Sequence, residues 1–100
     1  MIHPTASVHP TASVHPTASI GEGASIGPSA IVAPYAIIAE RVSIGSFARV
    51  GSGASVGPGA SIGKDAGIGE GAIIAPGVRV GEGAIVAPYT VVVHEKGRTT

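Results

Sequence analysis

The chain has 100 residues, a length typical of one domain, and no change in composition marks a second. Hydrophobic residues make up 44% but aromatic residues only 3%, which excludes a core built on large rings and favours a narrow core of small aliphatic side chains. The net charge is zero and cysteine is absent, which excludes a basic surface for nucleic acid or membrane, a disulfide framework and a thiolate metal site.

A six-residue repeat runs along the chain from Ile2 to Val92. Every sixth residue in this span is a β-branched aliphatic, here called an anchor, and the residue four places after most anchors is Ala. Six is not a helical period, and β-branched residues favour strands, so an amphipathic helix is excluded. Each repeat is predicted to place one large and one small side chain in the core.

Glycine and proline occupy fixed places between the anchors. All eight prolines lie two places after an anchor, and most glycines lie one or three places after. Pro sets φ for the first central residue of a tight turn and Gly supplies positive φ at the second, as in Pro58-Gly59 and Pro76-Gly77. Each hexapeptide is therefore predicted to be a short strand followed by a corner.

Three such hexapeptides close one triangular coil of 18 residues, so residues 18 apart stack. We expect residues 1–93 to form one all-β solenoid of about five coils, with residues 94–100 as a polar C-terminal tail. A sixth coil begins at Val92. The five coils start near Ile2, Ile20, Ile38, Val56 and Ile74.

The repeat resembles that of the bacterial hexapeptide-repeat acyltransferase superfamily. The matching pattern is aliphatic, Gly, X, X, Ala, X, as in Ile-Gly-Glu-Gly-Ala-Ser at 20–25 and Val-Gly-Pro-Gly-Ala-Ser at 56–61. The opening Ile-His-Pro-Thr-Ala-Ser-Val-His-Pro is similar to the start of the UDP-N-acetylglucosamine acyltransferases. The resemblance implies a left-handed parallel β-helix, although parallel crossovers in general favour the right hand. It also implies a trimer with acyl-CoA or acyl carrier protein in grooves between subunits.

The sequence departs from that superfamily where catalytic parts are expected. No residue interrupts the hexapeptide register from Ile2 to Val93, so no loop is predicted to hold a cofactor, and residues 94–100 stand where those enzymes commonly have a helix. His-Pro-Thr-Ala-Ser also occurs in three tandem copies. We therefore predict a structural or self-assembling solenoid, idealised or engineered, with no cofactor and no catalytic site of its own.

Histidines are the candidates for chemistry. His3, His9 and His15 share one sequence context, but residues six apart occupy different corners of one coil, so the three rings are predicted to diverge. Divergent rings cannot supply zinc ligands at about 2 Å from one metal, so no metal site is expected. The carbonic anhydrases of this fold would need His in the middle coils, where this chain has none. His94 adjoins Glu95 in the predicted tail.

The residues just before each anchor point outward and form three columns. One column carries Ser7, Ser25, Ser43 and Ser61, and because no base accompanies them it is predicted to be a polar ladder rather than a set of nucleophiles. Another column is partly apolar. Exposed β-branched residues in a row favour association, so we predict a homo-oligomer, a trimer by analogy. The predicted interface residues are Ile37, Ile73 and Val91.

Two alternatives stay open. One is a small acyltransferase, or a fragment of one, that uses acyl-CoA or acyl carrier protein at a trimer interface. The other is an ice-binding or other surface-binding module, although ice-binding faces usually carry paired ranks of Thr. The sequence shows no signal peptide and no membrane span, so we expect a soluble protein that would be cytoplasmic in a bacterium, without nucleic-acid or membrane partners.

Overall fold

The computed structural model describes residues 2–93; Met1 and the predicted tail at 94–100 lie outside the described residues. The described part forms strands of two residues each, separated by tight corners, and an isolated bridge pairs Ile2 with Ile20. The strands are β1 (Ser7–Val8), β2 (Ser13–Val14), β3 (Ser19–Ile20), β4 (Ser25–Ile26), β5 (Ile31–Val32), β6 (Ile37–Ile38), β7 (Ser43–Ile44), β8 (Arg49–Val50), β9 (Ser55–Val56), β10 (Ser61–Ile62), β11 (Gly67–Ile68), β12 (Ile73–Ile74), β13 (Arg79–Val80), β14 (Ile85–Val86) and β15 (Val91–Val92).

Each strand pairs in parallel with the strand three places further along the chain, which gives three five-stranded sheets. We call the sheet β1-β4-β7-β10-β13 the serine face, β2-β5-β8-β11-β14 the groove face and β3-β6-β9-β12-β15 the isoleucine face. The register is constant, as in the pairing of Ser7 with Ser25 and of Val8 with Ile26. The predicted coil of 18 residues is confirmed.

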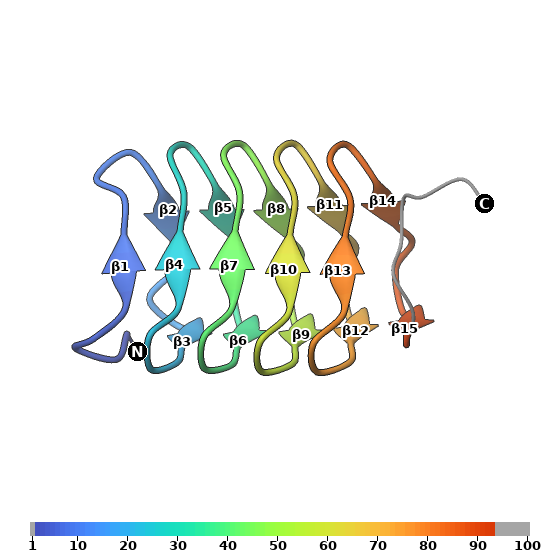
Figure 1. Ribbon diagram of the computed structural model, residues 1–100, viewed down its shortest axis with the longest axis horizontal. Helices are drawn as coiled ribbons and strands as arrows, with labels where there is room; N and C mark the ends of the chain where they lie inside the picture. Colours follow the sequence, from blue (N-terminus) through green and yellow to red (C-terminus); the bar gives the residue numbers. More distant parts are fainter. Residues whose placement is uncertain (1, 94–100) are drawn as a thin grey trace.

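The three sheets enclose a prism with extents of 38 × 21 × 18 Å. In Figure 1 the chain rises along the near face, crosses to the rear at the top and advances from N- to C-terminus towards the right. That sense of winding is left-handed, as the family resemblance implied. The described part of the chain holds no helix that could span a bilayer.

The core consists of stacked aliphatic side chains with no buried polar residue among those described. Anchors such as Ile38 and Ile74 are 1% exposed, and the small residues between them, such as Ala54, are fully buried. The first coil is more open, because the described residues include no coil before it: Ile2 is 44% exposed and Val8 is half-buried. The prediction of a narrow core with one large and one small residue per side is confirmed.

The corners follow the predicted turn chemistry only in part. Gly59 and Gly77 have φ near +73°, as their Pro-Gly sequences predict. Six other residues adopt positive φ without being glycine. Each corner is held by a hydrogen bond between coils, such as that from the Phe47 N–H to the Pro28 carbonyl (3.0 Å), which offsets the backbone strain. The six non-glycine residues with positive φ are Ser29, Tyr35, Arg41, Phe47, Asp65 and Tyr89.

Candidate binding groove

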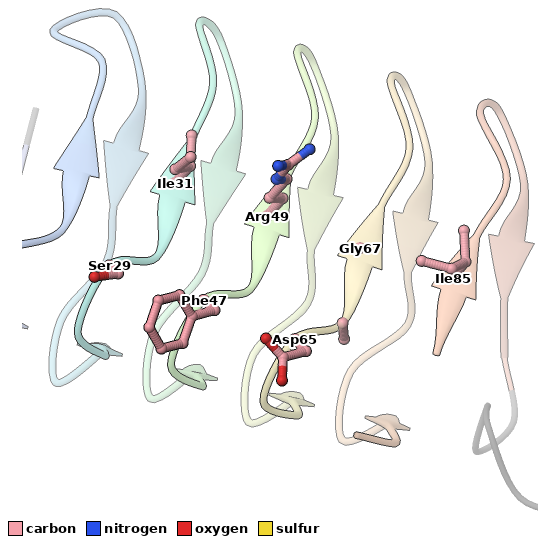
Figure 2. A pocket seen from close by; sticks show the side chains of 8 residues that line it. Ser29, Ile31, Phe47, Arg49, Asp65, Gly67 and Ile85 are labelled. Atoms are coloured by element: carbon pink, nitrogen blue, oxygen red, sulfur yellow. The ribbon is translucent and has the colours of Figure 1, made fainter. Parts of the chain in front are cut away.

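An open groove of about 460 Å³ lies along the groove face and the corner that leads into it (Figure 2). Its volume lies within the range of about 300 to 1,000 Å³ that is common for small-molecule sites. The lining mixes aliphatic, aromatic and charged side chains from several successive coils. The lining residues are Ser29, Ile31, Phe47, Arg49, Asp65, Ala66, Gly67 and Ile85.

Gly67 accounts for the hollow in this face. It pairs in register with Arg49 on one side and with Ile85 on the other, and all three occupy outward positions of their strands. Figure 2 shows the side chains of Arg49 and Ile85 flanking a position that has none. A Cβ added to Gly67 would lie 3.3 Å from Ile85 Cδ1, so a larger residue would fill the gap. The groove therefore needs no inserted loop.

The corner beside Gly67 contributes an aromatic ring and a carboxylate. Phe47 and Asp65 are the third corner residues of successive coils, and both have positive φ, at 62°. The Asp65 N–H donates to the Ser46 carbonyl at 2.9 Å, which fixes the corner to the coil before it. Phe47 is 57% exposed. Its ring offers a surface on which a planar group could stack, and the Asp65 carboxylate accepts hydrogen bonds.

Arg49 supplies the positive charge of the groove. Its backbone N–H donates to the Ala66 carbonyl at 2.9 Å, but within residues 2–93 its guanidinium has no ion-pair or hydrogen-bond partner, whereas Arg41 pairs with Glu40 at 3.3 Å on an exposed corner. The guanidinium carries several N–H donors in a planar fork that matches phosphate and carboxylate oxygens. Arg49 is therefore free to bind an anion that enters the groove.

The three candidate histidines lie away from this groove, at the corners of the first coil. In each, Nδ1 accepts a hydrogen bond from the backbone N–H of the Thr two residues on, as from Thr5 to His3 at 3.1 Å. The Thr hydroxyl lies within 2.9 Å of the same nitrogen in His3 and His9. Because Nδ1 is an acceptor, the neutral ring carries its proton on Nε2 and does not offer that nitrogen as a base. Among residues 2–93 no group of three or more His, Asp or Glu is placed to hold a metal ion.

The isoleucine face carries the predicted association column. Ile37, Ile73 and Val91 are 51%, 47% and 59% exposed, and Ser55 separates Ile37 from Ile73 in the column. The serine face carries a column of serines that stack in register: Ser7, Ser25, Ser43 and Ser61. Among the described residues, no hydrogen bond joins their hydroxyl groups to a basic side chain. Association through the isoleucine face stays a prediction.

Fold and repeat together place this chain among the hexapeptide-repeat β-solenoids of the acyltransferase superfamily. The model of the GMPPB C-terminal domain matches residues 1–96, so the chain belongs to that family. A search of the curated proteins finds no match.

Several solved structures are similar to the chain over almost all of its length. PerB from Caulobacter crescentus, solved with CoA and GDP-perosamine, has a TM-score of 0.83 and 29% identity over 98% of this chain and 50% of that one. The acetyltransferase domain of PglB from Neisseria gonorrhoeae, solved with acetyl coenzyme A, has a TM-score of 0.82 and 27% identity over 95% of this chain and 49% of that one. The chain thus spans about half the length of either structure.

A third solved structure shows the fold alone. It is a hexapeptide transferase family protein from Anaplasma phagocytophilum, with a TM-score of 0.70 and 17% identity over 91% of this chain and 68% of that one. At this identity the likeness carries no information about activity.

These neighbours contradict the prediction of a structural or self-assembling solenoid without a catalytic site of its own. PerB and PglB are acetyltransferases with CoA or acetyl-CoA bound, which favours the acyltransferase alternative. The prediction failed because it took an unbroken hexapeptide register to mean that no groove exists. The structure forms a groove by omitting one side chain, at Gly67, rather than by inserting a loop. Arg49, Asp65 and Gly67 were not singled out from the sequence, although stacking residues 18 apart places Arg49 beside Gly67.

Proposed function

We propose that this chain is the acyl-CoA-binding solenoid of a hexapeptide-repeat acyltransferase and that the thioester lies along the groove face. The observation that carries the proposal is the likeness of nearly the whole chain to two acetyltransferases solved with CoA or acetyl-CoA. The chain itself adds a groove of suitable volume with an unpaired cation. The three corner histidines have no part in this site.

The chemistry of the groove matches the parts of an acyl-CoA molecule. Arg49 would bind a phosphate oxygen through its guanidinium, as a charge-assisted hydrogen bond. The exposed Phe47 ring would pack against the adenine or the pantetheine arm. Asp65 would accept a hydrogen bond from an amide or amino N–H, which keeps its carboxylate away from the phosphates. The hollow at Gly67 would admit the extended chain close to the sheet.

The shape of the solenoid favours a site between subunits. The isoleucine face and the groove face meet at one edge of the prism, and both carry exposed aliphatic residues, among them Ile73 and Ile85. Three prisms set with this edge towards a common axis would leave a wedge-shaped cleft between the isoleucine face of one subunit and the groove face of the next. The polar serine face would then meet solvent. In such a trimer each ligand would lie in the groove of one subunit and would also contact the neighbouring subunit.

Calorimetric titration of the intact chain with CoA and acetyl-CoA tests the proposal. We expect saturable binding, weakened at least about tenfold by Gly67→Val, which fills the hollow at a strand position that favours β-branched residues. Ser43→Val makes the same kind of change on the serine face and is expected to leave the affinity unchanged. Absence of binding by the folded chain, or equal affinity of both variants, would contradict the proposed site.

A further inference from the structure

The corners of the solenoid fall into two kinds, distinguished by where the N–H of the third corner residue points. Beyond the second coil this N–H donates to a backbone carbonyl of the preceding coil, as from Arg41 to Glu22 at 2.8 Å and from Gly53 to Pro34 at 3.1 Å. The residue that donates has positive φ. A corner of this kind therefore requires a coil before it.

The first coil has no coil before it among the described residues, so no preceding carbonyl can accept from its corner N–H groups. Side chains of the first coil accept these hydrogen bonds instead. Each corner has the sequence His-Pro-Thr. The Thr N–H turns back to Nδ1 of its own His, at 3.1 Å for Thr5 and Thr11 and at 3.2 Å for Thr17. None of the three Thr residues has positive φ. The Pro between them has no N–H, so these corner positions leave no donor unpaired.

The same Thr side chain serves the next coil. The N–H groups of Gly23, Ser29 and Tyr35 would each need a carbonyl of the first coil, and each donates instead to a Thr Oγ1 at 3.0 Å. The Thr hydroxyl thus accepts from the second coil while it donates to the His ring. One short relay, repeated at all three corners, replaces the backbone bonds of an ordinary corner.

We propose that the three His-Pro-Thr corners are an end cap that makes this coil the terminal coil of the solenoid. Repeat proteins need atypical terminal repeats, because an end that resembles the interior invites another copy to stack on it. Here the corner N–H groups that would pair with a stacked coil are already bonded within the cap. The cap is independent of acyl-CoA binding, and it disfavours the stacking of another copy on this end, because the corner donors that such a copy would need are already bonded.

Two sets of substitutions test whether the His and Thr contacts of the cap stabilise the first coil or contribute nothing to its stability. The first replaces Thr5, Thr11 and Thr17 together by Val, with the triple Ser variant as control, because Ser keeps the hydroxyl. The second replaces His3, His9 and His15 by Leu, with the triple Asn variant as control, because Asn places an acceptor oxygen where Nδ1 lies. We expect the Val and Leu variants to melt roughly 4 to 8 °C lower for each corner and the Ser and Asn variants to stay near the unmodified chain.

Two further experiments test the cap even if a triple variant fails to fold: hydrogen exchange at one amide, and the transfer of His-Pro-Thr to an interior corner. With Thr11→Val alone, the amide of Ser29 should exchange with solvent at least about tenfold faster than in Thr11→Ser. His-Pro-Thr placed at the interior corner Gly57-Pro58-Gly59 should lower the melting temperature, because a Cβ at position 57 would lie 2.6 Å from Pro76 N and position 59 has φ +73°.

Three results would overturn the cap. The first is equal melting of the Val and Ser variants or of the Leu and Asn variants, together with unchanged Ser29 exchange. The second is an interior His-Pro-Thr corner as stable as the original. The third concerns stacking alone: light scattering should show the Leu variant forming larger, concentration-dependent species than the Asn variant, and equal masses would contradict the claim that the cap blocks this end.

Discussion

The ring of Tyr89 covers Gly71 in the coil before it. A Cβ built on Gly71 would lie 2.5 Å from Cε1 and 2.6 Å from Cδ1 of that ring. Both residues have positive φ, and the Tyr89 N–H donates to the Glu70 carbonyl at 2.8 Å. Gly71 is therefore required for two reasons: its backbone has positive φ, and the aromatic ring of Tyr89 packs against it and leaves no room for a Cβ.

This contact predicts unequal costs for two equivalent substitutions. Gly53 lies on the same edge with φ +69° and has nothing within 4 Å of an added Cβ. Gly53→Ala should lower the free energy of unfolding by about 1 to 2 kcal/mol through backbone strain alone. Gly71→Ala should cost roughly 1 kcal/mol more, because the Tyr89 ring must move. Urea denaturation measures both, and the extra cost should disappear in a Tyr89→Ala background; if it persists, the ring is not its cause.

The anchors are predicted to tolerate no charge. Ile44 is 3% exposed, while Ser43, the residue before it, points outward. Ile44→Asp should unfold the chain, since an unpaired carboxylate in this narrow core costs about 4 kcal/mol or more. Ser43→Asp should remain folded. Circular dichroism and size-exclusion chromatography compare the two variants, and a folded, soluble Ile44→Asp protein would refute the inward placement of the anchor.

The isoleucine face is predicted to mediate association. Ile37→Lys combined with Ile73→Lys should reduce the mass measured by light scattering to that of a monomer, because two ammonium groups would enter an apolar contact. Ser25→Lys with Ser61→Lys places the same charges on the serine face and should leave the mass unchanged. A monomeric unmodified chain at high concentration, or equal masses of the two variants, would remove this interface.

Arg49 is predicted to contribute to acyl-CoA affinity through a phosphate contact. Arg49→Gln should weaken CoA binding roughly tenfold or more, the scale of one hydrogen bond to a charged group. Arg79→Gln, an exposed arginine on the serine face, serves as the control. Titrations at several salt concentrations should also show a shallower salt dependence for Arg49→Gln. Identical salt dependence in both variants would mean that Arg49 does not contact a phosphate.

The sequence predicted the fold well, because its main signal is repeated in every coil. A β-branched anchor at every sixth position fixes which side chains point inward, and a slip of one residue would expose them all. The left hand followed only from family resemblance, since the period is the same for either hand. Positive φ at Phe47 and Asp65 was not predicted, because the bond between coils that offsets the strain is invisible in a six-residue motif.

The groove and the cap were harder to foresee for a different reason. Gly67 looks like any other outward residue until Arg49 and Ile85 are placed on either side of it, 18 residues away in each direction. The histidine rings of the His-Pro-Thr corners were predicted to diverge, but the relay from ring to hydroxyl to the next coil depends on side-chain rotamers. Both features depend on contacts between residues of neighbouring coils, and these contacts can be recognised in the sequence only after residues 18 apart are aligned.

The constant register between strands has a kinetic consequence. Every strand pair, from Ser7 with Ser25 to Ile73 with Val91, joins residues at the same separation along the chain. Each new coil therefore closes a loop of the same length, and the entropy lost in closing it does not grow as the solenoid lengthens. The slow event should be the docking of the first two coils, after which folding proceeds as a zipper whose every further step has nearly the same barrier.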